Sequence, residues 1–183
     1  ALNTLASRTQ HLGDFIARFR QVSSLPKPTL APHNLADMLQ GIVALHQQQA
    51  NSANVTIELI INSQPLVMLD SSQIEQVLIN LVKNALEALS VNKKNSVHAS
   101  TISPLIQLTL AQNSSQQLYI EISDNGTGIA EHVIEMIFVP FFTTKQQGSG
   151  IGLSLSRQIM LNHGGDLIYV PSTQGACFRC VFG

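Results

Sequence analysis

An amphipathic helix is predicted over residues 73–89, and it carries the side chain with the clearest chemical potential. At about 100° per residue, its apolar side chains fall on one face. A polar stripe follows the other face and consists of Gln76, Asn80, Lys83, Asn84 and Glu87. Asn84 lies at the edge of the stripe, where its neutral amide oxygen can bind a Mg²⁺ ion that already carries nucleotide phosphates. Taken alone, the stripe is more typical of a solvated helix face.

A glycine-containing segment at 124–129 (DNGTGI) offers a second set of ligand contacts. Asp124 ends a predicted strand, and its carboxylate can accept a hydrogen bond from the exocyclic amine of adenine. Gly126 and Gly128 allow the backbone to approach a ligand closely. A tight turn without a ligand is the alternative.

A third segment, 145–155 (KQQGSGIGLSL), places Gly148, Gly150 and Gly152 at the start of a predicted helix. Free N–H groups at such a helix start can bind phosphate, and Lys145 adds a positive charge. The spacing matches neither the phosphate loop of nucleotide triphosphatases nor the dinucleotide fingerprint. Between the glycine segments, 138–145 (FVPFFTTK) favours a lid that moves over the ligand. The alternative is a surface segment anchored by core phenylalanines.

The composition of the 183-residue chain is that of a globular domain with a small appendage. Hydrophobic residues make up 44% and charged residues 11%, and the net charge of -1 argues against nucleic acid or an anionic membrane as the main partner. The sequence contains no membrane span or signal peptide and begins with Ala1, so we expect a fragment of a longer protein. Cys177 and Cys180 lack neighbouring zinc ligands and are interpreted as strand residues that point to opposite faces, in a reducing compartment.

The predicted elements begin with a helix over 2–25 whose heptad pattern requires a partner helix, either from upstream residues or from another subunit. Packing of this helix on the chain's own core is the alternative. Prolines between 26 and 32 begin a second unit with one possible edge strand, and Asn34 is a candidate N-cap for a helix to about residue 50. The helix over 73–89 is expected to be capped by 70–72. The remaining predictions are strands at 55–63, 66–70, 105–112, 118–124, 166–170 and 177–182, helices at 131–138 and 151–162, a loop at 91–103 and a mobile loop at 139–150.

This order predicts an α+β fold, a two-layer sandwich in which helices cover one face of a mixed, mostly antiparallel sheet. A doubly wound sheet is not favoured, because no strand leads into a glycine turn of a βαβ unit.

Four segments in this order and spacing resemble the catalytic ATP-binding domain of sensor histidine kinases from two-component systems, especially the nitrogen-regulation type. They are NLVKNALEAL (80–89), DNGTGI (124–129), FVPFFTTK (138–145) and GSGIGLSLSRQI (148–159). The wider resemblance is to the superfamily of gyrase, heat-shock chaperone, histidine kinase and mismatch-repair ATPases, with its Bergerat-type ATP-binding fold. It covers about residues 26–183 and implies that 1–25 form the C-terminal helix of a dimerisation and phosphoacceptor hairpin.

The resemblance implies a protein-histidine kinase, a phosphoprotein of signal transduction that uses ATP and Mg²⁺. Its γ-phosphoryl group would go to a His upstream of this fragment and then to an Asp of a response-regulator receiver domain. Asn84 would bind Mg²⁺, with Asn80 and Lys83 near the phosphates, and Asp124 would bind the adenine amine. The further contacts that it implies are Gly126, Gly128 and Ile129 at the base, Phe141, Phe142, Thr143, Thr144 and Lys145 in the lid, and Gly148, Ser149, Gly150, Ile151, Gly152 and Leu153 around the triphosphate. A homodimeric full-length protein and a cytoplasmic location of this domain are also implied, and the parent protein could be membrane-anchored.

The sequence departs from the family pattern at several points. None of its six histidines is followed by an acidic residue, as the phosphoacceptor would be, and His11 lies on the wrong helix of the hairpin, so we expect the acceptor outside this chain. His163 is expected to be a helix-end residue. Asn80 stands where the superfamily's ATPases place a water-activating Glu, which favours transfer to an imidazole over hydrolysis. Ala176 stands where the family often has Thr or Ser, which predicts weaker adenine binding or a substituting water.

Two alternatives of other kinds stay open. A non-catalytic ATP-binding or dimerisation scaffold is disfavoured by the intact Asn84, Asp124 and glycine segments. A water-using ATPase of the same fold is disfavoured by Asn80.

Overall fold

The computed structural model describes residues 25–95, 103–145 and 148–183, with the side chains of 91–95 excepted. All but the last residue of the helix predicted over 2–25, including His11, therefore lie outside the described residues. Among the described residues, no helix combines the length and the apolar character that crossing a bilayer requires.

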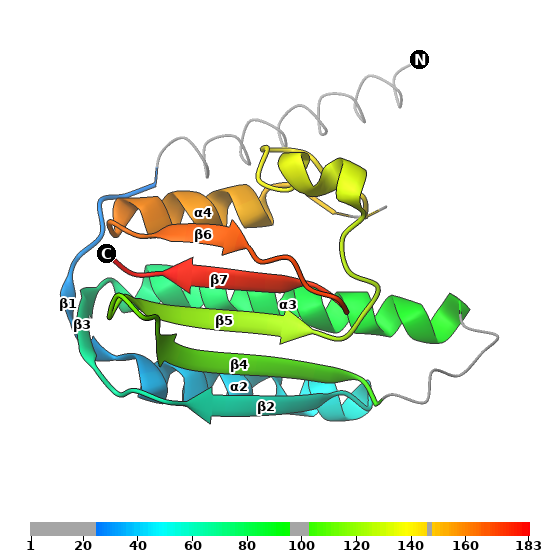
Figure 1. Ribbon diagram of the computed structural model, residues 1–183, viewed down its shortest axis with the longest axis horizontal. Coiled ribbons are helices and arrows are strands. Elements are labelled where there is room, and N and C mark those ends of the chain that lie inside the picture. Colours follow the sequence, from blue (N-terminus) through cyan, green and yellow to red (C-terminus); the bar gives the residue numbers. More distant parts are fainter. Residues whose placement is uncertain (1–24, 96–102, 146–147) are drawn as a thin grey trace, which may run out of the picture.

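The described elements follow the predicted order closely (Figure 1). They are β1 (Ala31–Asn34), α2 (Leu35–Ser52), β2 (Thr56–Ile61), β3 (Leu66–Leu69), α3 (Ser71–Asn95), β4 (Leu105–Gln112), β5 (Leu118–Asp124), the 3-10 helix η1 (Glu131–Met136), α4 (Gly152–Asn162), β6 (Asp166–Tyr169) and β7 (Cys177–Val181).

The main sheet is mixed and mostly antiparallel, as predicted. Its strand order is β2-β4-β5-β7-β6, in which β2 and β4 are parallel and the other neighbouring pairs are antiparallel. β4 and β5 form the predicted hairpin around 113–116. β1 and β3 pair with each other in a separate antiparallel ribbon. The segment before Asn34 thus does contain an edge strand.

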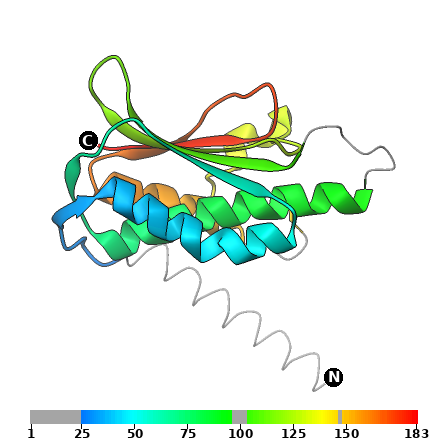
Figure 2. The ribbon, with the colours of Figure 1, turned by 90° about the horizontal axis from the view of Figure 1, so that it is seen from below.

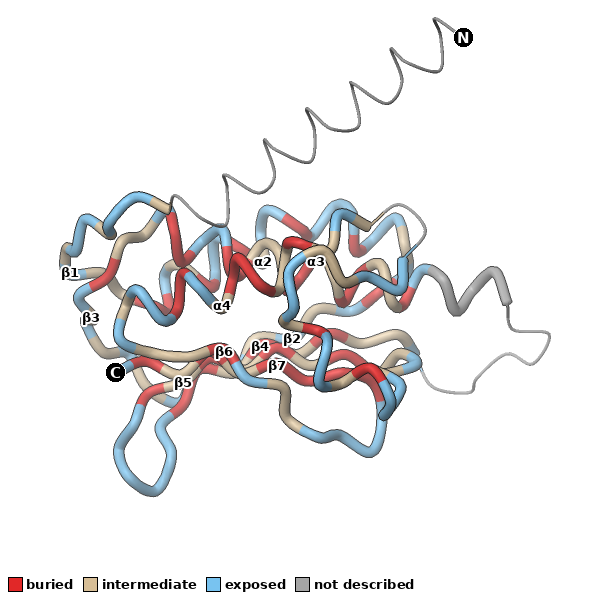
Figure 3. The backbone as a smooth tube through the Cα atoms, turned by 90° about the horizontal axis from the view of Figure 1, so that it is seen from above, coloured by how far each residue is buried: buried red, intermediate tan, exposed pale blue. Residues whose placement is uncertain are grey.

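The helices α2, α3 and α4 lie together on one face of the main sheet, and this arrangement makes a two-layer sandwich (Figures 2 and 3). α3 contacts both α2 and α4 as well as β4 and β5, so it is the central helix of its layer. Because it has neighbours on two sides, its buried face is wider than periodicity alone predicts. Val82 and Leu86 are buried in addition to the predicted apolar positions, of which Ile74, Val77, Leu78, Leu81, Ala85 and Leu89 are buried.

One strand pairing departs from the order of the chain, and one predicted boundary is wrong. The strands near 55–63 and 66–70 are consecutive in the chain but not partners, because β2 aligns its core-facing side chains with β4. β3 instead exposes Leu66 and Met68. The predicted loop at 91–103 begins too early, since α3 continues to Asn95. A helix already nucleated by packing extends at little cost through polar residues such as lysine.

Asp70 and His163 connect the start of α3 to the end of α4. Asp70 Oδ1 accepts hydrogen bonds from Ser72 Oγ at 2.7 Å and from the Gln73 N–H at 3.2 Å, so the predicted cap of α3 is present. The Asp70 N–H donates to His163 Nε2 at 3.1 Å, and His163 is the C-cap of α4, the helix-end position that was expected. The Ser72 hydroxyl, with the N–H groups of Thr29 and Gln73, lowers the pKa of Asp70 to about 2.

Candidate functional site

A stripe of α3 brings the three predicted ligand-binding segments together. Its residues are Asn80, Asn84 and Ala88, which lie one helical turn apart and therefore share a face. Each contacts a different segment that lies far away in the sequence. In Figure 1, β5 ends and β7 and α4 begin toward the right-hand side of the main sheet.

Asn80 lies against the first turn of α4. Its Nδ2 donates to Ser156 Oγ at 3.0 Å. A Cβ added at Gly152 would collide with the Asn80 side chain, so the glycine allows this close approach. Asn80 thereby fixes the position of the α4 N-terminus relative to α3.

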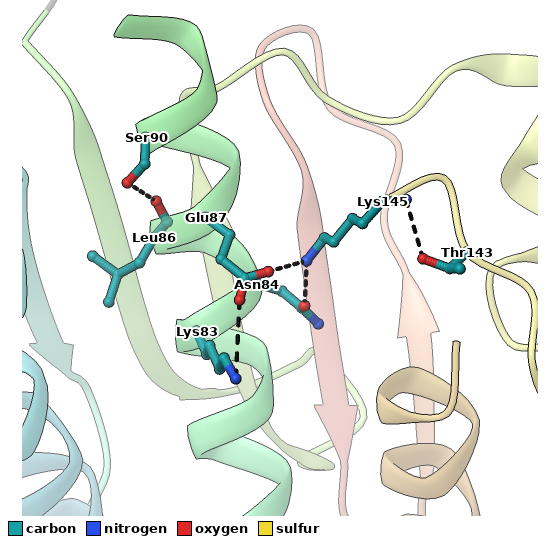
Figure 4. Close-up of polar contacts among 7 residues, drawn as sticks. All are labelled: Lys83, Asn84, Leu86, Glu87, Ser90, Thr143 and Lys145. Carbon is teal, nitrogen blue, oxygen red and sulfur yellow. Dashed lines mark hydrogen bonds and ion pairs between the residues drawn. The ribbon is translucent and has the colours of Figure 1, made fainter. Parts of the chain in front are cut away.

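Asn84 is held by the lid residue Lys145 (Figure 4). Lys145 Nζ donates to Asn84 Oδ1 at 2.7 Å and to Glu87 Oε2 at 2.6 Å. Lys83, from the preceding turn, lies 4.0 Å from Glu87 Oε1, and its side chain is 64% exposed. Glu87 therefore lies between two ammonium groups. Lys145 shows that the Asn84 oxygen can receive a cation.

Asp124 closes the other end of the stripe. It is only 8% exposed, and its Oδ1 accepts the Gly126 N–H at 2.8 Å and the Ala176 N–H at 3.4 Å. A Cβ added at Gly126 would lie 3.6 Å from the Ala88 Cβ, so this turn packs on α3. Burial raises the pKa of Asp124, although the two N–H donors oppose the shift.

The glycines after β5 and before β7 are required by backbone contacts. Gly175 has φ +70°, and an added Cβ would collide with the carbonyl group of Asp124. Gly128 has φ +73°, and its added Cβ would lie 2.8 Å from the Gly175 oxygen. Both positions favour glycine on conformational grounds as well. The turn that carries Asp124 is thereby locked against the β6–β7 connection.

The lid segment is anchored at its base by paired backbone groups. The Phe141 N–H donates to the Gly150 oxygen at 2.7 Å, and both residues have positive φ, 68° each. An added Cβ at Gly148 would collide with Thr143 Oγ1, which itself accepts the Lys145 N–H at 3.1 Å. These contacts set the direction in which Lys145 leaves the backbone.

The first turn of α4 lies against the stripe, with Gly152 and Ser156 beside Asn80. Ile151, which has no polar side-chain atom, occupies the N-cap position. Such a helix start is suited to an anion. Ser149 Oγ accepts the Ile151 N–H at 3.4 Å, and Ile129 and Leu153 pack against the core, while Thr143 and Thr144 are exposed.

Two neighbouring side chains were missed by sequence reasoning as parts of this site. Glu87 was assigned only to the polar stripe, although its spacing of three residues from Asn84 places the two side by side. Arg157 pairs with Asp166 through Nε–Oδ1 at 2.8 Å and Nη2–Oδ2 at 3.1 Å. Its guanidinium lies 5.1 Å from the centre of the Phe138 ring, just before the lid. Only the fold brings these groups together.

The donor set fits a magnesium ion that is bound mainly through phosphates. No cluster of three or more His, Cys, Asp or Glu within the described ranges could hold a metal alone. The Asn84 oxygen already contacts an ammonium group, and a hard cation prefers such an oxygen. A single protein oxygen next to the start of α4 is compatible with a metal that is bound mainly through nucleotide phosphates.

Comparison with known proteins identifies the family. Residues 69–182 match the family model described as histidine kinase-, DNA gyrase B-, and HSP90-like ATPase. Sensor protein FixL of Bradyrhizobium diazoefficiens is 32% identical over 98% of this chain and 34% of its own length. Sensor histidine kinase ZraS of Escherichia coli K12 is 33% identical over 85% of this chain and 31% of its own length. The chain thus spans about a third of the curated relatives that it matches.

Solved structures agree with this assignment. The catalytic domain of histidine kinase ThkA in a nucleotide-free form superimposes with a TM-score of 0.68 and 28% identity, covering 84% of this chain and 94% of that one. ShkA in complex with AMPPNP has a TM-score of 0.73 at 18% identity, covers 97% of this chain and 37% of that one, and supports the fold alone. This chain therefore belongs to the histidine kinase-, DNA gyrase B- and HSP90-like ATPase family and is an ATP-binding catalytic domain of the sensor histidine kinase type.

Proposed function

We propose that residues 26–183 bind Mg²⁺-ATP along the stripe of Asn80, Asn84 and Ala88, and that the γ-phosphoryl group is transferred to a histidine outside this chain. The observation that carries this proposal is the stripe itself. At successive turns it contacts the α4 start, the lid and the Asp124 turn. An extended ligand with a base at one end and phosphates at the other fits this order.

The base is assigned to Asp124. Oδ1 accepts two N–H groups, which leaves Oδ2 for the adenine amine. Gly126, Gly128 and Ile129 would line the base pocket. The Ala176 N–H also contacts Asp124, so the missing Thr or Ser at that position removes a hydroxyl without removing this backbone donor.

The phosphates are assigned to the start of α4 and the lid. The N–H groups after Ile151 and the glycines Gly148, Gly150 and Gly152 would surround them, with Lys145 as a mobile positive charge. Asn84 would bind Mg²⁺, which supplies neutralisation of the triphosphate charge. Thr143, Thr144, Phe141 and Ser149 would complete the lid side, and Lys83 and Asn80 the helix side.

The reaction needs positioning more than acid–base chemistry. An imidazole nitrogen already has a lone pair, so it can form the new N–P bond while the bond between the γ-phosphorus and the bridging oxygen breaks and ADP leaves. Asn80 precedes Asn84 by one turn, and its amide, which donates to Ser156, cannot take a proton from water. Transfer to an imidazole is therefore favoured over hydrolysis.

The acceptor histidine is proposed to lie on a dimerisation hairpin whose second helix is residues 1–25, and a response-regulator Asp would receive the phosphoryl group next. ThkA, whose catalytic domain is 28% identical to this chain, has also been solved in complex with response regulator protein TrrA. Relatives named sensor proteins are consistent with such a relay and with a homodimer of the full-length protein. A cytoplasmic location of the domain is proposed on the same grounds.

The test is incubation of this chain with γ-labelled ATP, Mg²⁺ and a separate polypeptide that carries the hairpin and its histidine. Label that is stable to alkali and lost in acid is expected on that histidine. Asn84→Ala should abolish it, whereas Gln76→Ala, an exposed amide on the same helix, should not. Labelled phosphate release without labelled protein would support the ATPase instead, and bound but unreacted ATP would support the scaffold.

A further inference from the structure

The Lys145 ammonium group contacts the Asn84 oxygen that is proposed to bind the metal ion, and it also contacts the carboxylate of Glu87. The ammonium group lies 2.7 Å from Asn84 Oδ1 and 2.6 Å from Glu87 Oε2 (Figure 4). Lys145 comes from the lid, 61 and 58 residues away from these two partners. An ammonium group and Mg²⁺ bound to the same amide oxygen would repel each other, so the two cations compete for it.

We propose that Glu87 is a positioning residue that holds the Lys145 ammonium on Asn84 Oδ1 in the nucleotide-free protein, so that the lid lysine acts as a substitute cation and is displaced when the metal–nucleotide binds. This inference rests on the proposed function, because it takes Asn84 as the metal ligand. Glu87 itself touches neither metal nor nucleotide in this scheme.

The exchange has a simple electrostatic logic. The amide oxygen of Asn84 carries no full charge, so Asn84 alone would hold an ammonium weakly. The carboxylate of Glu87 adds the opposite charge, and both side chains of this ion pair are about two-fifths exposed, at 44% and 40%. Exposed pairs of this kind are weak and are screened by salt. The contact can therefore open when Mg²⁺ and phosphates arrive, and the released Lys145 is then free to approach the phosphates.

The first measurement needs no nucleotide. The side-chain amide resonances of Asn84, assigned by their loss in Asn84→Ala, report on this contact directly. Glu87→Gln and Lys145→Met should each shift them, and Glu75→Gln, which removes an exposed carboxylate from the same helix, should not. Resonances that move in Lys145→Met but keep their wild-type positions in Glu87→Gln would overturn the positioning role.

The second measurement is calorimetric titration with Mg²⁺-ADP and with ADP in EDTA. Glu87→Gln should tighten Mg²⁺-ADP binding by about two- to fivefold, the range set by a weak exposed ion pair. Metal-free ADP should gain less, since it does not need Asn84. The gain should disappear in the Lys145→Met background and shrink at high salt. Thermal unfolding of each variant verifies the fold.

The other results contradict the inference. If Glu87→Gln acted only by removing a negative charge that repels the nucleotide, it would tighten the binding of metal-free ADP at least as much as that of Mg²⁺-ADP. Metal-free ADP is the more negatively charged of the two. Weaker Mg²⁺-ADP binding in Glu87→Gln would assign the carboxylate to the metal. Unchanged affinity would exclude a competing lysine. If the unmodified chain binds no nucleotide, the proposed function fails, whereas the resonance shifts in the free protein would still show whether Glu87 holds Lys145.

Discussion

Replacing Asp124 by Asn separates adenine recognition from folding. The side chain keeps its shape, so its oxygen can still accept the N–H groups of Gly126 and Ala176. The position of Oδ2 is taken by an NH₂ group, which cannot accept the adenine amine. Two donors then face each other in a site that is 8% exposed. Such a mismatch costs about 1–3 kcal/mol, or roughly 5- to 140-fold in the dissociation constant of ADP.

The same substitution should keep or raise the stability of the nucleotide-free protein, although it weakens ADP binding. Burial raises the pKa of Asp124, which means that the folded protein disfavours the charged form. The stability that this group contributes is present below its ordinary pKa and is lost as the pH rises through the raised value. At neutral pH the neutral Asn should therefore keep or raise the unfolding temperature, so weaker ADP binding cannot be attributed to unfolding.

The assay is calorimetric titration of both proteins with ADP and with inosine diphosphate, whose base carries a carbonyl oxygen in place of the amine. The new NH₂ group can donate to that oxygen, so Asp124→Asn should lose affinity for ADP and gain relative affinity for inosine diphosphate. Ser123→Ala, on the opposite face of the same strand, is the matched control. Unchanged ADP affinity, or equal losses for both nucleotides, would refute the assignment of the base to Asp124.

Three further outcomes are expected from the fold. Gly175→Ala should lower the free energy of unfolding by ~1–3 kcal/mol or more, because the positive φ is strained for alanine and the new Cβ would collide with the backbone of Asp124. Gly41→Ala, at a helix position on α2 with open space around it, should raise the free energy of unfolding by up to ~1 kcal/mol. Equal urea midpoints for the two variants would contradict this. The pKa of Asp70 is about 2 against an ordinary 3.8, so its contribution to stability is present above pH 3.8 and is lost as the pH falls toward 2. Asp70→Asn should therefore reduce the pH dependence of the unfolding free energy in this window. An unchanged pH profile would argue against the cap. Burial raises the pKa of both Cys177 and Cys180 to about 12, so a thiol reagent at pH 8 should label them only on unfolding, and rapid labelling of the folded protein would contradict their burial.

Features that depend on neighbouring residues were predictable from the sequence. The Asn34 cap of α2 is a hydrogen bond from the Ala36 N–H at 2.9 Å, and the cap of α3 at Asp70 is equally local. The β4–β5 hairpin and the buried face of α3 follow from alternation and helical periodicity. The glycines at 126, 148, 150 and 152 were singled out by spacing, and each allows another part of the chain to approach closely, while their contacts with a ligand stay a prediction. The resemblance of four segments added the family, which the comparisons confirm.

Other features were decided only when distant segments packed together. No local signal makes β2 choose β4 over β3, because strand partners are selected by core packing and not by the turn between neighbours. Likewise, helical periodicity placed Glu87 on a polar helix face. Its contact with Lys145, which lies 58 residues later in the lid segment, forms only in the folded protein. Hydrogen bonds within a helix or turn are fixed by the chain's own geometry, whereas a contact across such a separation exists only after the layers have closed around a shared core. The sequence therefore determined that Asn80 and Asn84 share one helix face, and the tertiary structure decided that the turn after Asp124 packs beside that face.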